Sequence, residues 1–174
     1  GEWSWDSYAT EDTTMGDCFD LMIQVSDNTC AEALLDLLGM PHVQADAAAA
    51  GATETTFEPL DIHSTSNDEA EFLAKLAQNK LPISASGRAR WLFDLKNNAY
   101  RDGIPAGIPN AVVADKVGFQ DEMLRDAAIV YSPKGAFVLV IMASYASWDD
   151  FADLAAAIET ARKVAAALPK ARFL

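Results

Sequence analysis

The sequence is poor in positive charge and has no long apolar run. Its 174 residues hold 13 Lys and Arg against 26 Asp and Glu, a formal net charge of −13 at pH 7. Nucleic acid is therefore not an expected partner, because binding to phosphates needs clustered cations. A membrane-spanning helix needs about 18 or more consecutive apolar residues, and no such run is present. The first ten residues lack the basic and apolar regions of a signal peptide, so none is expected there.

Cysteine is equally scarce, with only Cys18 and Cys30. Two cysteines cannot make a disulfide scaffold, and neither has the histidine or cysteine neighbours of a zinc site. No metal and no other cofactor is therefore expected. The two cysteines flank residues 26–28, so they could bridge two predicted helices or remain as two buried thiols, and the sequence leaves both alternatives open.

Apolar residues are abundant, at 51% of the chain, which is enough for the core of one domain. Up to about residue 98 they recur at helical spacing, and Ser, Thr, Pro and Gly stand where helices begin and end. Helices are predicted over 13–25, 29–39, 41–51, 64–80 and 84–98. The Gly- and Pro-rich stretch 101–110 is predicted to be a loop.

The pattern changes after residue 110 to short runs of β-branched and apolar residues. Strands are predicted over 111–119, 125–133 and 136–144. A Ser-Pro-Lys-Gly turn joins the last two strands in a hairpin, and a final helix over 147–168 is predicted to begin at Ser147.

The expected fold is therefore α+β. A short N-terminal segment, 1–12, precedes a helical block over about 13–98. An antiparallel sheet covered by a C-terminal helix follows, over about 111–168.

The tripeptide Ser26-Asp27-Asn28 stands between the first two predicted helices and has two interpretations. Ser, Asp and Asn are the preferred N-cap residues, so the tripeptide could simply begin the second helix. It could also be half of an active site, in which case a partner residue is expected elsewhere in the chain.

Lys116 is the candidate partner. It lies inside the predicted apolar strand 111–119, whose valines at 112, 113 and 117 are expected to be buried, whereas a strand lysine is usually solvated on an outer face. Gly118 would let a ligand approach this strand closely. Arg125 begins the next, antiparallel strand, so Lys116 and Arg125 could lie close together and bind a carboxylate.

The order of these motifs resembles the class A serine β-lactamases and the related penicillin-binding proteins. Ser-Asp-Asn at a helix junction is followed about 90 residues later by Lys-x-Gly on a strand before a hairpin and a terminal helix, and the family motifs are Ser-x-x-Lys, Ser-Asp-Asn and Lys-Thr-Gly. The similarity runs from about Thr13 to the C-terminus. It implies a β-lactamase/transpeptidase-like fold, incomplete at the N-terminus, and a protein of the cell envelope or the extracellular space.

The resemblance also implies an activity and a role for each matching residue. The activity would be serine acylation by β-lactams or peptidoglycan peptides. Ser26 would relay a proton to the leaving group, and Asn28 would hydrogen-bond the substrate's amide. Lys116 would hold the substrate carboxylate and act electrostatically on Ser26, and Arg125 falls where many class A enzymes place a second carboxylate ligand. The backbone N–H of Phe119 would form half of an oxyanion hole.

The sequence departs from the family pattern in three places. No serine is followed by lysine three residues later, so the chain is expected to be a C-terminal part of the domain, inactive alone. Val117 replaces the hydroxyl-bearing residue of Lys-Thr-Gly. Glu58, in Phe-Glu-Pro, is similar to the glutamate of the class A omega loop, but this loop is shorter. Glu58 is therefore either catalytic or a solvated loop carboxylate, and a shortened loop would favour a penicillin-binding or peptidase role through slow deacylation.

Two functions remain open. The intact protein is either a serine hydrolase with a small-molecule substrate or a binding or interaction domain that keeps the fold without the chemistry. In the family, N-terminal strands complete the sheet, so strand 136–144 would otherwise be an apolar edge. A homodimer contact or a missing N-terminal segment is expected to cover it.

Overall fold

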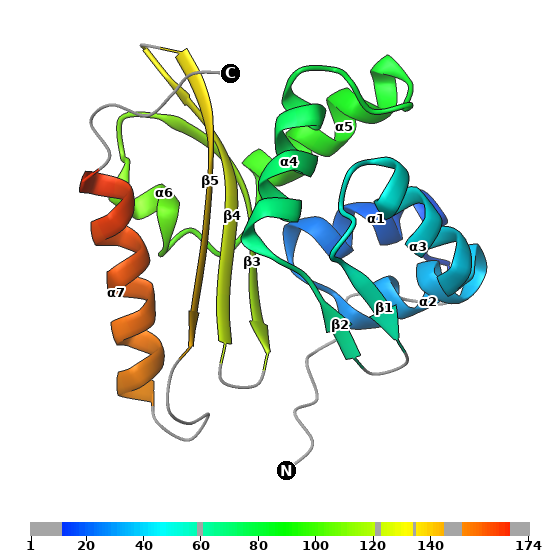
Figure 1. The fold of residues 1–174 in the computed structure, drawn as a ribbon, viewed down its shortest axis with the longest axis horizontal. Coiled ribbons are helices and arrows are strands. Elements are labelled where there is room, and N and C mark those ends of the chain that lie inside the picture. Colours follow the sequence, from blue (N-terminus) through cyan, green and yellow to red (C-terminus); the bar gives the residue numbers. More distant parts are fainter. Residues whose placement is uncertain (1–11, 59–60, 121–122, 134, 145–150, 168–174) are drawn as a thin grey trace.

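A three-stranded antiparallel sheet stands between a large helical block and two further helices (Figure 1). This computed structural model describes residues 12–58, 61–120, 123–133, 135–144 and 151–167. The sheet comprises β3 (Val112–Gln120), β4 (Met123–Ser132) and β5 (Gly135–Ser144). The α+β class and the antiparallel hairpins are as the sequence predicts.

The five helices of the helical block are α1 (Met15–Gln24), α2 (Asn28–Leu38), α3 (Met40–Ala49), α4 (Ser66–Ala77) and α5 (Ala85–Lys96). Side-chain caps set where four of them begin, because each cap oxygen accepts a backbone N–H that the helix cannot pair. Thr14 begins α1 in a reciprocal capping box with Asp17, and Asp27, Thr65 and Ser84 begin α2, α4 and α5. All five helices lie within the predicted segments or within one residue of them.

The structure differs from the sequence-based expectation in two places. A small hairpin of β1 (Thr56–Glu58) and β2 (Asp61–His63) interrupts the helical block. Three-residue strands are too short to show an alternating pattern, and a contact from another segment supports this hairpin, because Phe57 N–H donates to Gln44 Oε1 at 2.9 Å.

The second difference lies in the predicted loop 101–110, which contains the short helix α6 (Ile104–Gly107). Pro105 stands in its first turn, where the fixed backbone angle of proline suits a helix and its missing N–H is not needed. Ile104 is fully buried, so packing against the sheet supports this single turn.

Alternation along the strands directs successive side chains to two different cores. Ala114, Ala127 and Ile129 face the helical block and pack with leucines of α4 and α5. Val113, Ala128 and Val130 face the opposite side. There they pack with α6 and with α7 (Phe151–Ala167), so helices cover both faces of the sheet. The predicted cap of α7 at Ser147 lies outside the described residues.

Two hydrogen bonds tie the chain after α5 to the end of α1. Asn98 Nδ2 donates to the carbonyl of Ile23, and the N–H of Ala99 donates to the carbonyl of Gln24, both at 2.8 Å. These bonds hold the end of α1 against the segment that follows α5 and leads through α6 into β3.

The sheet has two outer strands, β3 and β5. Within the described ranges β5 pairs with β4 alone, along its full length from Gly135 to Ser144. The expectation that a second chain or segment covers this apolar edge stays a prediction. Among the described helices, none is long and apolar enough to cross a membrane.

Candidate functional site

Ser26 lies at the turn between α1 and α2. Its φ angle is +56°, in the left-handed region that residues other than glycine rarely adopt. The turn is held on both sides, because Asp27 N–H donates back to the carbonyl of Leu21 at 3.3 Å. The side chain of Asp27 accepts from Cys30 N–H at 2.9 Å, so it is Asp27 that caps α2. The helix-start interpretation is thus correct for Asp27 and leaves Ser26 available for another role.

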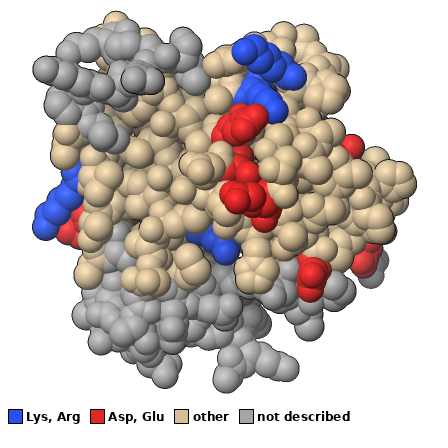
Figure 2. All heavy atoms as spheres, viewed as in Figure 1, with Lys and Arg blue, Asp and Glu red and all other residues tan. Residues whose placement is uncertain are grey.

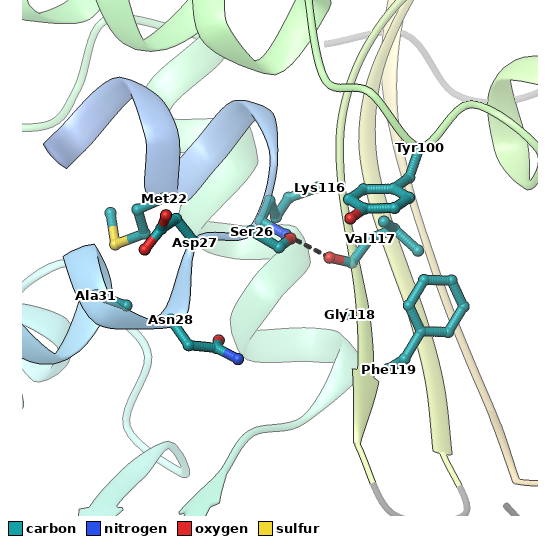
Figure 3. Close-up of a pocket in the computed structure, with 10 residues that line it drawn as sticks. All are labelled: Met22, Ser26, Asp27, Asn28, Ala31, Tyr100, Lys116, Val117, Gly118 and Phe119. Carbon is teal, nitrogen blue, oxygen red and sulfur yellow. Dashed lines mark hydrogen bonds between the residues drawn. The ribbon is translucent and has the colours of Figure 1, made fainter. Parts of the chain in front are cut away.

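Lys116 reaches Ser26 from β3. Its ammonium nitrogen, Nζ, donates hydrogen bonds to Ser26 Oγ and to the carbonyl of Val117. Figure 3 shows the two side chains meeting between the helix junction and the strand. The structure therefore brings together the two residues on which the active-site interpretation depends.

The surroundings of Lys116 disfavour its charged form. Burial lowers the pKa of Lys116 to about 8, and the carboxylates of Asp115 and Asp126 act against this shift. A lysine with such a pKa can release and recover a proton near neutral pH, whereas an exposed lysine stays charged.

Ser26 and Lys116 border a cleft of about 250 Å³. Asn28, Gly118 and Phe119, all predicted as substrate-binding residues, line the same cleft, and Asn28 is exposed at the start of α2. Val117 also borders it, while packing with Leu124 and Ala161 on the other side of the strand.

Tyr100 is a cleft residue that the sequence analysis missed. Its ring meets the ring of Phe119 edge to face, with centroids 6.3 Å apart, and its hydroxyl donates to the carbonyl of Val25 at 3.4 Å. Tyr100 lies outside every recognised motif, and only the path of the chain after α5 places it here.

A second, larger hollow of about 600 Å³ adjoins the cleft and shares Lys116, Val117 and Gly118 with it. Arg125 lines this hollow and is the register partner of Gly118 across the β3–β4 pair. Most other lining side chains are apolar, among them Phe57, Phe72 and Trp91.

Glu69, on α4, is the second residue that the sequence analysis missed. It is half-buried in the larger hollow, and burial raises its pKa, while the charge of Arg125 and a hydrogen bond with Ser64 act against that shift. Figure 2 shows acidic side chains gathered near the middle of this face, over α4. The sequence indicates only that Glu69 suits the first turn of a helix.

Glu58 is exposed at the end of β1 and lines neither the cleft nor the larger hollow. The structure therefore does not bring it to Ser26 or Lys116. Its place corresponds to the second of the two alternatives, a solvated carboxylate.

Cys18 and Cys30 are both free and both buried, so the thiol alternative describes this structure. Burial raises the pKa of Cys30 to about 12, and the neighbouring Cys18 thiol adds to the effect. Within the described part of the chain, no group of three or more His, Cys, Asp or Glu residues could hold a metal ion.

Comparisons with known proteins show the family and the fold. The model of the beta-lactamase enzyme family matches residues 2–171. The structure of PBP-A is similar to this chain, with a TM-score of 0.76 and 23% identity over 86% of this chain and 59% of PBP-A. A beta-lactamase from Sphaerobacter thermophilus is similar with a TM-score of 0.77 and 22% identity, over 89% of this chain and 62% of the other.

A PBP-A mutant in an acyl-enzyme complex with penicillin G matches with a TM-score of 0.79 and 21% identity, over 91% of this chain and 63% of the mutant. The chain thus spans roughly three fifths of the length of these structures. No curated protein matches the chain.

Proposed function

The chain belongs to the beta-lactamase enzyme family, and from that premise we propose that it forms the proton-relay and substrate-binding side of a serine acyl-transfer site. The substrates are β-lactams or peptidoglycan peptides. The observation that carries the proposal is the hydrogen bond from the ammonium of Lys116 to Ser26 Oγ at the rim of a cleft.

The proposed step is a relay of one proton. When the bond between the substrate's carbonyl carbon and its leaving nitrogen breaks, Ser26 gives its hydroxyl proton to that nitrogen. Lys116 replaces the proton through the existing hydrogen bond and becomes neutral. A pKa of about 8 for Lys116 supports this transfer, because the ammonium then loses its proton at little cost near neutral pH.

The remaining residues of the cleft and of the adjoining hollow bind the substrate in this proposal. Lys116, and Arg125 from the larger hollow, attract the substrate carboxylate, and Asn28 hydrogen-bonds its amide. The N–H of Phe119 stabilises the oxyanion that forms during acylation. Val117 supplies no hydroxyl to the carboxylate. A lost hydrogen bond weakens binding by about 0.5–1.5 kcal/mol relative to a threonine there, and by more when the acceptor is charged, as a carboxylate is.

The acylated serine comes from outside this chain, in a Ser-x-x-Lys segment, since no serine of the 174 residues has a lysine three positions later. In this proposal such a segment fills the larger hollow, which has apolar walls and adjoins the cleft that Ser26 borders. The chain alone is therefore inactive. The exposed position of Glu58 supports slow deacylation, so the intact protein accumulates an acyl-enzyme as a penicillin-binding or peptidase-type protein does.

The alternative function is a domain that binds carboxylate ligands without chemistry. Val117 favours it, because the hydroxyl of the family motif is absent. Under this alternative Lys116 and Arg125, which both line the larger hollow, still attract an anion, but no covalent product forms.

Labelling with a fluorescent penicillin separates the two functions. The protein is produced with the residues encoded upstream of Gly1, incubated with the probe and analysed on a denaturing gel. We expect covalent label on the longer protein, reduced labelling in Lys116→Ala, and none on the 174-residue chain. Unlabelled longer protein that still binds penicillin reversibly would establish the alternative.

Partners and location are further parts of the proposal. A segment outside this chain, or a second copy, pairs with the open edge of β5, and analytical ultracentrifugation of the longer protein tests this through its mass. The resemblance to envelope enzymes supports an extracellular or cell-envelope location, and fractionation of producing cells tests it.

A further inference from the structure

Two aspartates lie buried on the face of β3 and β4 that is turned away from the helical block. Asp115 is opposite Ala128 and Asp126 is opposite Val117, so the aspartates are diagonal neighbours across the strand pair. Their exposed fractions are 0% and 1%. Lys116, the next residue along β3, extends to the opposite face and to Ser26.

Only one oxygen of each carboxylate has a hydrogen-bond or ion-pair partner. Arg101 forms an ion pair with Asp115 Oδ1 and donates to the carbonyl of Val113 at 3.0 Å. Ile104 N–H donates to Asp126 Oδ2 at 2.7 Å, and a side chain at Gly103 would collide with that oxygen. Asp115 Oδ2 and Asp126 Oδ1 are buried and have no hydrogen-bond partner among the described residues.

The charged groups around the pair are few. Arg101 and Lys116 are the cations whose charges act on both carboxyl groups. Arg162, on α7, packs against the same side but directs its guanidinium to Glu159 and to the carbonyl of Asp102. The local charge of the pair is therefore balanced by Arg101 and by Lys116 through the strand.

We propose that Asp115 and Asp126 are positioning residues for Lys116, whose buried negative charge on one face of β3 keeps the ammonium on the other face charged and hydrogen-bonded to Ser26. Burial disfavours the ammonium of Lys116, and the charges of these two carboxylates oppose that effect. The two carboxylates and the two cations, Arg101 and Lys116, each favour the charged form of the other kind of group.

Asp115 and Asp126 keep their carboxyl protons to a higher pH than exposed aspartates do. Burial, with repulsion from Asp126, raises the pKa of Asp115 to about 7, and burial raises the pKa of Asp126 to about 6. Both carboxyl groups are thus largely ionised above neutral pH, which is the range in which Lys116 would otherwise lose its proton. The value of this arrangement for acyl transfer rests on the function proposed above, but the charge coupling does not.

The test measures the pKa of Lys116 directly in the 174-residue chain. Lysine is labelled with ¹³C at Cε, and the signal is assigned by its loss in Lys116→Met. Asp115→Asn and Asp126→Asn are compared with Asp102→Asn, which removes an exposed charge from the same region. We expect each buried variant to lower the pKa of Lys116 by about one unit, a tenfold change in its ratio of charged to neutral forms. Asp102→Asn should leave it unchanged.

Asp126→Asn keeps the inference testable if Asp115→Asn fails to fold without its ion pair, because an asparagine oxygen can still accept from Ile104 N–H. A folded Asp126→Asn protein with the Lys116 pKa of the parent chain would overturn the inference. Absence of acylation in the longer protein would instead count against the proposed function and leave the charge coupling standing.

Discussion

Lys116 Nζ donates a hydrogen bond to Ser26 Oγ across 90 residues of sequence, joining the sheet to the junction of α1 and α2. The donor is a lysine whose pKa is lowered to about 8 by burial. The acceptor is a serine whose backbone is in the left-handed region. Strained or destabilised groups of this kind concentrate at functional sites.

The backbone strain at Ser26 can be measured by comparing two substitutions. Ser26→Ala and Ser26→Gly both remove the hydroxyl, but only glycine adopts a φ of +56° without steric cost. We expect the glycine variant to be more stable than the alanine variant by about 1 kcal/mol in urea unfolding. Equal stability of the two variants would mean that the turn is not strained.

Stability should fall as the pH rises from about 4 to 7. Asp115 and Asp126 have folded-state pKa values of about 7 and about 6, above the usual 3.8, so the folded chain holds protons that the unfolded chain has released. The stability that these protons provide is full below about pH 4 and is lost as the pH passes the raised values. Urea unfolding at pH 5 and pH 7 measures the slope, and Asp126→Asn should reduce it. A slope unchanged by that substitution would contradict the assignment.

The two cysteines should titrate as free thiols. Under denaturing, non-reducing conditions an aromatic disulfide reagent is expected to react with both Cys18 and Cys30. In the folded chain Cys30 should react far more slowly than a small exposed thiol, because it is buried and its pKa of about 12 leaves almost no thiolate. In Cys18→Ser only the thiol of Cys30 remains, so the reaction of this variant identifies the slow phase as that of Cys30. Failure to detect thiols in the unfolded chain would show that a bridge forms.

Glu69 and Arg125 should affect anion binding in opposite directions. Glu69 partly neutralises Arg125 in the larger hollow. Glu69→Gln should therefore tighten reversible binding of benzylpenicillin by about 0.2–1 kcal/mol, up to about fivefold in Kd, whereas Arg125→Ala should weaken it. NMR titration of the 174-residue chain detects such weak binding. Tighter binding in both variants would show that Arg125 does not contact the carboxylate.

Local sequence signals account for most of the fold. Thr14, Asp27, Thr65 and Ser84 begin helices because capping depends on residues close in sequence, and strand alternation assigns Ala114 and Val113 to opposite faces. The β1–β2 hairpin and α6 depend on contacts with distant segments, such as that of Phe57 with Gln44, which no local pattern contains.

The candidate site was predictable where a motif marked it and unpredictable elsewhere. Ser26 stands at a predicted helix junction and Lys116 inside an apolar strand, and the order of their motifs resembles a known family. Tyr100 and Glu69 belong to no motif, and only tertiary packing places them beside the cleft. Glu58 shows the opposite case, since its neighbours in sequence resemble a catalytic loop while the residue itself lies on the surface of β1.

The hydrogen bonds from Asn98 and Ala99 to the end of α1 oppose separation of α1 from the segment that follows α5. They connect the turn that carries Ser26 to the segment that leads into β3, which carries Lys116. The two sides of the cleft are therefore joined by these bonds as well as by the hydrogen bond between Lys116 and Ser26. The amide proton of Ala99 should accordingly exchange with solvent only when the whole interface between α1 and the sheet comes apart.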